Sequence, residues 1–220
     1  SVEPRIARST YVKYEQLARN YIVPYFDTIT CKELDNNQLH RFCSVIHQKE
    51  STSKRPLSVG NQRTIFMIMN NTLDYAYDSR ILDQRYYIRP RLARTRRVVQ
   101  VFSQEHQRKI EDYVLHHDDE CSLAVMLALF TGLRLGEICA LQWEDISFET
   151  NSLYVNKTVQ RLNTTNKSGD ARTKLLVSHP KSAASNRLIP LPAFLIKYLG
   201  QFPHEAEHAY VLNNEIYTPM

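Results

Sequence analysis

Apolar residues recur at helical spacing through the first third of the chain. The first stripe is aliphatic and aromatic and returns every three or four residues: Tyr14, Leu17, Ala18, Tyr21 and Tyr25. Asp35 followed by Gln38 forms a capping box before a second stripe, and Ser58 can cap a third helix. Such stripes are buried only against one another, so the pattern predicts a small helical domain over residues 1–88.

The pattern changes after this domain. Residues 89–102 are rich in arginine, and Pro90 disfavours a helix, so we expect an extended basic linker. Ser103 can cap the first helix of a second domain, residues 103–220. An apolar helix then ends at Gly132, and a short amphipathic helix is expected to turn its apolar residues inward: Leu135, Ile138 and Leu141.

Past Trp143 the apolar period becomes two. Leu153, Val155 and Val159 alternate with polar residues, which predicts a half-buried strand. Two further strands are expected at residues 173–178 and 187–191, and Pro192 suits the first turn of a closing helix. The predicted fold is mainly α with a small three-stranded antiparallel β-sheet, in two domains.

Composition adds limits on the class of protein. The net charge of +5 and the pI near 9.0 favour an anionic partner only weakly. We expect a cytosolic protein, because no apolar run is long enough to span a membrane and no secretory signal pattern opens the chain. The four cysteines form no CxxC and are interpreted as reduced core residues: Cys31, Cys43, Cys121 and Cys139. The histidines lack metal-ligand company and are interpreted as structural or solvated, so no metal site is expected.

The basic residues are concentrated in two stretches. One has no carboxylate: Arg85, Arg89, Arg91, Arg94, Arg96 and Arg97. The other has Asp170 as its one acid: Lys157, Arg161, Lys167, Arg172, Lys174, Lys181 and Arg187. Two such stretches separated by acidic or neutral scaffold are typical of a nucleic-acid-binding surface. On charge alone, two solvated loops explain them equally well.

The segment from Thr131 to Glu137 reads TGLRLGE and carries the clearest chemistry. Gly132 can end one helix in the left-handed conformation, and Arg134 then opens the next, where a guanidinium fork can grip a phosphate. Glu137 lies one turn further on the same face and can orient its neighbours. By spacing alone, a common surface Arg–Glu pair is the favoured interpretation.

Three parts of the sequence resemble the tyrosine recombinase family. Residues 131–146 are similar to its first signature box, roughly TGxRxGEhxxLxWxDh with h apolar. Residues 180–191 resemble its β-hairpin segment, which carries a catalytic lysine. Residues 9–25 and 61–83 are similar to the core-binding domain of integrases from phages and conjugative transposons. The resemblance implies site-specific DNA recombination or integration, by strand breakage and rejoining through a phosphotyrosine intermediate, without a cofactor.

The resemblance also assigns residues. Arg134 matches the first catalytic arginine, Lys181 the lysine that protonates the departing 5′-oxygen, and Glu137 a supporting acid. Outside its motif, Lys181 would be read as an ordinary turn lysine. Four linker arginines would neutralise DNA phosphates: Arg91, Arg94, Arg96 and Arg97. Arg63 and Lys174 are candidate DNA contacts, and Arg187 matches a basic hairpin position that either contacts DNA or packs.

The family's second box and its nucleophilic tyrosine have no match in these residues. Tyr210 and Tyr217 come too early in the family's motif order. We therefore expect a fragment that binds duplex DNA without cleaving it, and an N-terminal arm-binding domain is an open question. The resemblance implies a dimer or tetramer on DNA, an accessory DNA-bending or excision factor, and a bacterial, nucleoid-associated location. The alternatives are a non-catalytic DNA-binding protein or inactive paralogue, and a helical protein-interaction module.

Overall fold

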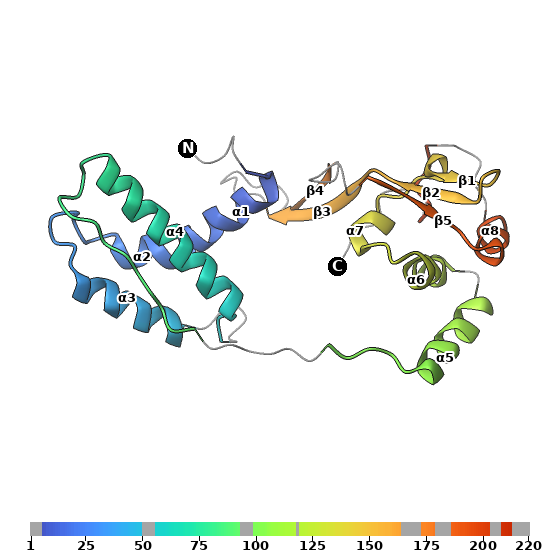
Figure 1. The fold of residues 1–220 in the computed structure, drawn as a ribbon, viewed down its shortest axis with the longest axis horizontal. Coiled ribbons are helices and arrows are strands. Elements are labelled where there is room, and N and C mark those ends of the chain that lie inside the picture. Colours follow the sequence, from blue (N-terminus) through green and yellow to red (C-terminus); the bar gives the residue numbers. More distant parts are fainter. Residues whose placement is uncertain are drawn as a thin grey trace. The chain divides into compact units, whose positions relative to one another are not determined.

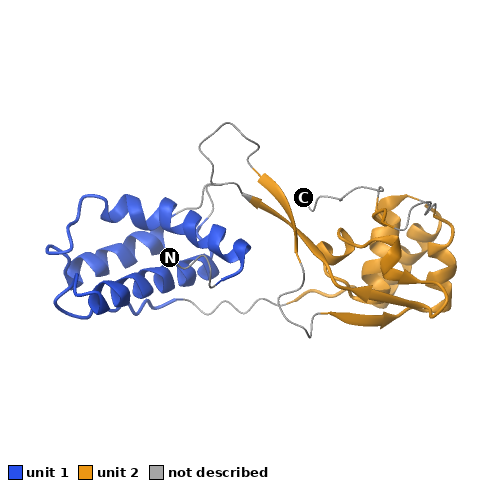
Figure 2. Cartoon of the chain, turned by 90° about the horizontal axis from the view of Figure 1, so that it is seen from above, with its two compact units in different colours: residues 1–98 blue, residues 99–220 orange. Residues whose placement is uncertain are grey.

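The computed structural model describes residues 6–49, 56–92, 99–117, 119–163, 173–178, 186–202 and 208–212. The chain divides into two compact units, residues 1–98 and 99–220 (Figure 2). The division falls inside the segment expected to be a linker. The first unit is helical and the second combines helices with small antiparallel sheets, so the predicted fold class is confirmed.

Helices build the first unit (Figure 1). They are α1 (Arg8–Leu17), the π-helical turn η2 (Ala18–Ile22), α2 (Val23–Phe26), α3 (Asn36–Gln48) and α4 (Val59–Asp78). The π-helical turn ends two residues before Pro24, and it contains Asn20, four residues before the proline. A proline has no N–H to donate and clashes with the carbonyl four residues earlier in a regular helix, so the wider turn lets the chain continue on a helical course.

Both predicted N-caps of this unit are present. The Asp35 carboxylate accepts a hydrogen bond from the Gln38 backbone N–H (2.7 Å), and the Gln38 side chain accepts one from the Asp35 backbone N–H (3.1 Å). The Ser58 hydroxyl accepts a hydrogen bond from the Asn61 N–H (3.2 Å). These bonds satisfy N–H groups that have no partner within the helix, and they fix where α3 and α4 begin.

The core of the first unit extends beyond its last helix. Buried side chains from α1, α3 and α4 pack with three residues that follow α4: Leu82, Tyr86 and Ile88. The helices contribute Leu17, Leu39, Phe42, Ile46, Ile65, Phe66, Met69 and Leu73. The Asn70 amide pairs with the backbone of Ile88 in both directions (2.8 and 3.0 Å). The Tyr86 hydroxyl donates to the Leu34 carbonyl (2.6 Å). Residues 82–92 are therefore anchored along the helices.

Helices of the second unit enclose a separate core. They are α5 (Gln104–Leu115), α6 (Glu120–Thr131), α7 (Leu135–Ile138) and α8 (Ala193–Leu199). The Ser103 hydroxyl caps α5 through the His106 N–H (3.2 Å), as predicted. The core joins all four helices to the sheet through buried residues that include Val114, Leu123, Leu127, Ile138, Leu153, Leu195 and Leu199.

The strands differ from the three-stranded sheet that the sequence predicts. A three-stranded antiparallel sheet has the order β1 (Ile146–Ser147), β2 (Ser152–Val155), β5 (Arg187–Pro190). A separate two-stranded hairpin pairs β3 (Thr158–Asn163) with β4 (Thr173–Ser178). The single strand expected across residues 153–159 is interrupted because Asn156 and Lys157 bond to the side chains of Asp145 and Glu144. These side-chain bonds are invisible to an alternating pattern.

Two side-chain placements also correct the sequence-based expectations. Ile138 and Leu141 are buried, but the side chain of Leu135 is 60% exposed and does not turn inward. All four cysteines are free, yet Cys31 and Cys121 are exposed, so only Cys139 is a buried core residue and Cys43 is half-buried. Within the described ranges, no helix combines the length and apolar character needed to cross a membrane.

Residues 208–212 form a short segment that pairs with the backbone at the start of η3 (Trp143–Asp145). The Trp143 N–H donates to the Ala209 carbonyl (3.0 Å), and the Val211 N–H donates to the Leu141 carbonyl (2.9 Å). Val211 and Leu212 are buried in the second core. Tyr210 is half-buried beside Gln142, whereas Tyr217 lies outside the described residues.

Candidate active site

The turn between α6 and α7 gives Arg134 its position. Gly132 adopts the left-handed conformation (φ 65°) that ends α6, as predicted. Arg134 follows with an extended backbone (φ −73°, ψ 151°) and is the N-cap of α7. An N-cap residue lies at the end of its helix. The backbone of Arg134 is therefore held in place by α7, while its side chain extends from the end of the helix.

Gly136 brings α7 into direct contact with β3. A Cβ atom at this position would lie 2.6 Å from the Thr158 hydroxyl oxygen and 2.6 Å from the Val159 carbonyl oxygen. Both distances are shorter than carbon and oxygen tolerate, so any larger residue would push α7 away from the hairpin. The second glycine of the TGLRLGE segment, Gly136, is therefore required by packing.

Glu137 connects three parts of the second unit. Its side chain is 5% exposed, and its two oxygens accept four hydrogen bonds from residues that the structure describes. Arg134 supplies two of them, from its backbone N–H (2.9 Å) and from Nη1 (2.8 Å). Arg187 in β5 supplies the other two, from Nη1 (3.1 Å) and Nη2 (2.9 Å). A carboxylate accepts about four hydrogen bonds, so this one is fully used.

These bonds set the charge state of Glu137. Burial raises the pKa of the carboxyl, but the hydrogen bonds from Arg187 and Arg134 outweigh burial and lower the pKa from 4.5 to about 2. The same pairing raises the pKa of Arg187. Glu137 is thus an anion at neutral pH.

The two arginines present themselves differently. The side chain of Arg134 is 74% exposed and that of Arg187 is 31% exposed. Arg134 contacts Glu137 through one terminal nitrogen, which leaves most of its guanidinium in solvent. A guanidinium held through Nη1 keeps Nε and Nη2 outside this contact, and these two donors can take two oxygens of a phosphate. The group has the chemistry of a phosphate clamp.

Lys157 does not fit the second basic stretch, which the sequence predicts to be part of a nucleic-acid-binding surface. Its side chain is 19% exposed and its ammonium donates to Gln142, to Glu144 (3.0 Å) and to Asp145 (3.4 Å). Burial lowers the pKa of Lys157, but the bond to Glu144 and the charge of Asp145 raise it above its ordinary value. This lysine is committed to an internal network and does not form part of an open cationic surface.

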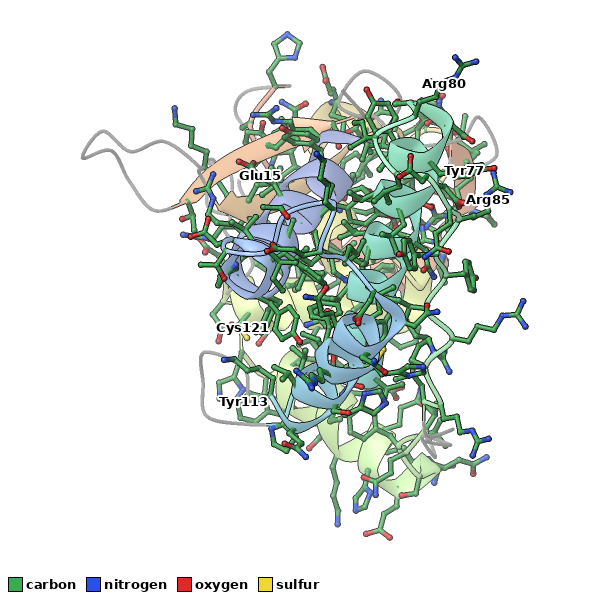
Figure 3. All side chains as sticks on the ribbon, turned by 90° about the vertical axis from the view of Figure 1, so that its left-hand side faces the viewer. Glu15, Tyr77, Arg80, Arg85, Tyr113 and Cys121 are labelled. Atoms are coloured by element: carbon green, nitrogen blue, oxygen red, sulfur yellow. The ribbon has the colours of Figure 1, made fainter. Side chains whose placement is uncertain are left out.

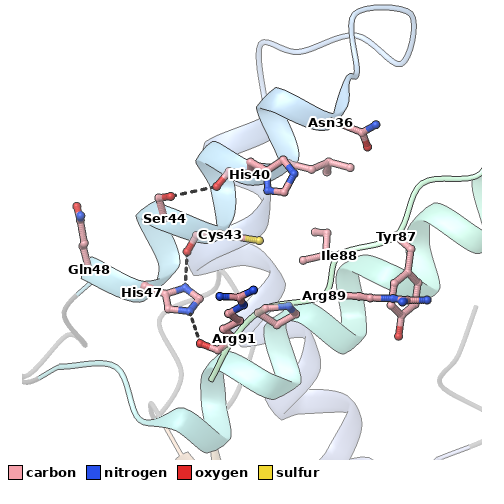
Figure 4. A pocket seen from close by; sticks show the side chains of 12 residues that line it. Asn36, His40, Cys43, Ser44, His47, Gln48, Tyr87, Ile88, Arg89 and Arg91 are labelled. Carbon is pink, nitrogen blue, oxygen red and sulfur yellow. Dashed lines mark hydrogen bonds between the residues drawn. The ribbon is translucent and has the colours of Figure 1, made fainter. Parts of the chain in front are cut away.

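The other residues predicted to contact DNA lie in separate elements of the chain. Arg63 on α4, Lys174 on β4 and Arg91 after α4 are exposed. Arg91 borders a pocket of about 500 Å³ between α3 and residues 87–91, where the His47 ring lies within hydrogen-bond distance of the Cys43 and Arg91 carbonyl oxygens (2.6 and 3.3 Å; Figure 4). Four predicted site residues lie outside the described residues: Arg94, Arg96, Arg97 and Lys181.

A further cationic group lies at the end of α4. Arg80 follows the helix in the left-handed conformation (φ 57°), where glycine or asparagine is usual. Arg85 lies over the ring of Tyr77 at 5.1 Å and near Asp74 and Asp78 (Figure 3). These contacts attach Arg85 to the helical unit.

The sequence predicted the pair of Arg134 with Glu137, but it did not predict that Arg187 also binds Glu137. Arg187 lies 50 residues away from Glu137 in sequence, and no local spacing joins them. The structure brings together Arg134, Glu137 and Arg187. The one available signal was that Arg187 and Arg134 each lie in a segment that resembles the same family.

Sequence comparisons agree with this organisation. The model of the Phage integrase family matches residues 96–189, and that of the Phage integrase, N-terminal SAM-like domain matches residues 1–45. A protein described as tyrosine recombinase XerC-like, from Caldanaerobacter subterraneus subsp. tengcongensis, is 26% identical over 201 residues, 88% of this chain and 49% of that protein. The chain thus spans about half the length of this curated relative.

Solved structures share the fold. The Tn1549 transposon integrase in complex with a circular intermediate DNA gives a TM-score of 0.63 at 14% identity, over 97% of this chain and 66% of the integrase. A lambda integrase dimer bound to a COC′ core site gives 0.52 at 17% identity, over 89% and 49%. This chain therefore shares its two-unit fold with these integrases. Both units thus match models of phage integrase domains, the first over residues 1–45 and the second over residues 96–189.

Proposed function

We propose that this chain binds duplex DNA and supplies part of the active site of a site-specific recombinase. The observation that carries the proposal is the exposed guanidinium of Arg134, anchored through Nη1 by the buried carboxylate of Glu137. The structures of the Tn1549 and lambda integrases contain DNA, which supports duplex DNA as the partner here.

The chemistry assigned to this site is phosphoryl transfer through tyrosine. A tyrosine hydroxyl attacks the phosphorus of the DNA backbone, the bond to the 5′-oxygen breaks, and a 3′-phosphotyrosyl link forms. Arg134 would hold the non-bridging oxygens and stabilise the negative charge that grows on them. Lys181 would give its proton to the departing 5′-oxygen. Attack by a second strand's 5′-hydroxyl reverses the step and rejoins DNA.

No residue of this sequence matches the family's tyrosine nucleophile. We propose that these residues alone bind DNA without forming the covalent link, and that a complete recombinase acts as a dimer or tetramer, with an accessory DNA-bending factor. Arg91, Arg94, Arg96 and Arg97 would neutralise backbone phosphates, and Arg63 and Lys174 would approach the bases.

Binding to a fluorescent 30-base-pair duplex of mixed sequence tests the proposal. Affinity should fall steeply with salt, because each neutralised phosphate releases counterions and contributes a slope of about −0.9 in log K against log salt. Replacing Arg91, Arg94, Arg96 and Arg97 by alanine should flatten that slope by roughly three to four units. Replacing Arg108 and Lys109 on α5, which lies in the acidic stretch, should leave it unchanged.

Two results would overturn the proposal. One is binding that does not change between low and moderate salt. The other is an Arg134→Ala variant that binds a duplex carrying one 3′-phosphate nick as tightly as the parent does, since an open guanidinium should recognise the exposed phosphate.

A further inference from the structure

Arg187 and Arg134 compete for the same carboxylate. Both oxygens of Glu137 are engaged by the fork of Arg187, at 3.1 and 2.9 Å, and one of them also meets Nη1 of Arg134 at 2.8 Å. The carboxylate carries one negative charge against two positive ones. Arg187 forms two side-chain hydrogen bonds to the carboxylate and Arg134 forms one. The two-bond geometry is the stronger, so Arg187 provides most of the compensation for the negative charge of Glu137.

The exposures of the two arginines follow from this division. Arg187 directs both terminal nitrogens at Glu137 and is 31% exposed, whereas Arg134 uses one terminal nitrogen and stays 74% exposed. A buried carboxylate without Arg187 would draw the remaining cation inward, because unpaired charge in a poorly solvated place is costly. That cation is Arg134.

The backbone of Arg187 is fixed independently of this contact. It pairs with Val155 in the ladder between β5 and β2, and the whole ladder runs from Val155–Arg187 to Ser152–Pro190. Val155 is buried in the core. The guanidinium of Arg187 therefore reaches Glu137 from a rigid strand, whereas Glu137 lies on α7, a helix of one turn. The strand holds the helix.

We propose that Arg187 is a positioning residue that acts through Glu137: it neutralises the buried carboxylate so that Arg134 stays open for a phosphate oxygen. It does not itself bind DNA. The inference rests on the proposed role of Arg134. It decides between the two roles that the sequence left open for Arg187, a DNA contact or an internal partner.

Three variants separate these roles. Arg187→Gln removes the positive charge and leaves Glu137 to attract Arg134. Arg187→Gln combined with Glu137→Gln removes both charges, and at residue 137 the amide is nearly isosteric with the carboxylate it replaces. Arg187→Lys keeps the charge but not the fork. Thermal unfolding of each shows whether the second unit is folded, and the double variant stays informative if the single one unfolds.

The measurement is the Nε–H signal of Arg134 in ¹⁵N NMR spectra, titrated with inorganic phosphate and then with the mixed-sequence duplex. In the parent chain the signal should shift with both ligands. In Arg187→Gln the apparent affinity of that site should fall about tenfold, the double variant should regain most of the loss, and Arg187→Lys should lie between them.

The controls separate failure of this inference from failure of the proposed function. A parent chain whose Arg134 signal ignores DNA would overturn the role of Arg134. A responsive parent with an equally weak double variant, and a salt slope smaller by about one phosphate contact, would show that Arg187 binds DNA directly and would overturn the inference alone. An Arg187→Gln variant with unchanged Arg134 affinity would overturn it as well.

Discussion

Gly136 of α7 and Val159 of β3 touch through their backbones. The Val159 carbonyl oxygen lies 2.6 Å from the point where a Cβ on residue 136 would stand, and the Thr158 hydroxyl is equally close. The close approach seats the short helix against the hairpin, and the same helix carries Glu137. Packing at this glycine and pairing at Glu137 therefore support one another.

Replacing Gly136 by alanine should destabilise the second unit. The added methyl meets a backbone carbonyl that belongs to a strand, so the helix must move, and overpacking of this kind costs about 1–3 kcal/mol. Urea unfolding followed by tryptophan fluorescence reports the change, because Trp143 is the single tryptophan and lies in this unit.

Gly60→Ala is the matched control. Nothing lies within 4 Å of a Cβ at Gly60, which is in the first turns of α4. Alanine is the better helix former, so this change should leave stability equal or raise it by up to about 1 kcal/mol. Equal effects from the two substitutions would contradict the contact between α7 and β3.

The low pKa of Glu137 predicts acid sensitivity of the second unit. The carboxyl titrates near 4.5 when unfolded and at about 2 when folded. Its contribution is present in full above the unfolded value and is lost as the pH falls toward 2, because the unfolded chain then binds the proton more readily. The loss is on the order of 3 kcal/mol across this range.

Glu137→Gln tests this source of acid sensitivity. The variant cannot titrate at this position, so the difference in unfolding free energy between parent and variant should be largest near neutral pH and should shrink from about pH 5 to pH 2. Urea unfolding at a series of pH values measures it. A difference that stays constant over this interval would mean that another carboxyl sets the acid limb.

Lys157 should matter for stability and not for DNA binding. Its ammonium is 19% exposed and faces Asp145, whose side chain is 5% exposed, so Lys157→Ala leaves a buried carboxylate without its cation. We expect a loss of about 2 kcal/mol, below the roughly 3–5 kcal/mol of fully buried pairs. Lys109→Ala is the control, because Lys109 and Glu105 form an exposed pair worth about 0.5 kcal/mol.

DNA titrations of the same two variants complete this test. Because Lys157 is bound to Gln142, Glu144 and Asp145, its removal should leave the salt dependence of duplex binding unchanged once the protein is folded. A smaller salt slope in Lys157→Ala, measured below its unfolding temperature, would place this lysine on the DNA-binding surface.

Local chemistry was predictable from this sequence. The caps at Asp35, Ser58 and Ser103 and the left-handed Gly132 each depend on residues within four positions, and each was confirmed. Short-range bonding rules suffice for such features because the partners are fixed by the helix itself. The TGLRLGE segment that contains Arg134 was found in the same way, from seven consecutive residues.

Features that join distant segments were not predictable. The pairing of Glu137 with Arg187 depends on β5 lying in register with β2, which no local pattern specifies. Leu135 was expected to face inward, but a helix of four residues takes its orientation from the contact at Gly136 and not from its own periodicity. The break between β2 and β3 arises from side-chain bonds to Asp145 and Glu144.

The four cysteines should react in two classes. Cys31 and Cys121 are exposed, whereas burial raises the pKa of the Cys139 thiol and of the half-buried Cys43 thiol. Alkylation requires an accessible thiolate, so both effects protect the second pair. Brief treatment with iodoacetamide near neutral pH, followed by peptide mass spectrometry, should label Cys31 and Cys121 first. In urea all four should react, which controls for detection. Equally fast labelling of Cys139 in the folded chain would show that the contact between α7 and β3 opens, since Cys139 packs there with Ala140 and Val159.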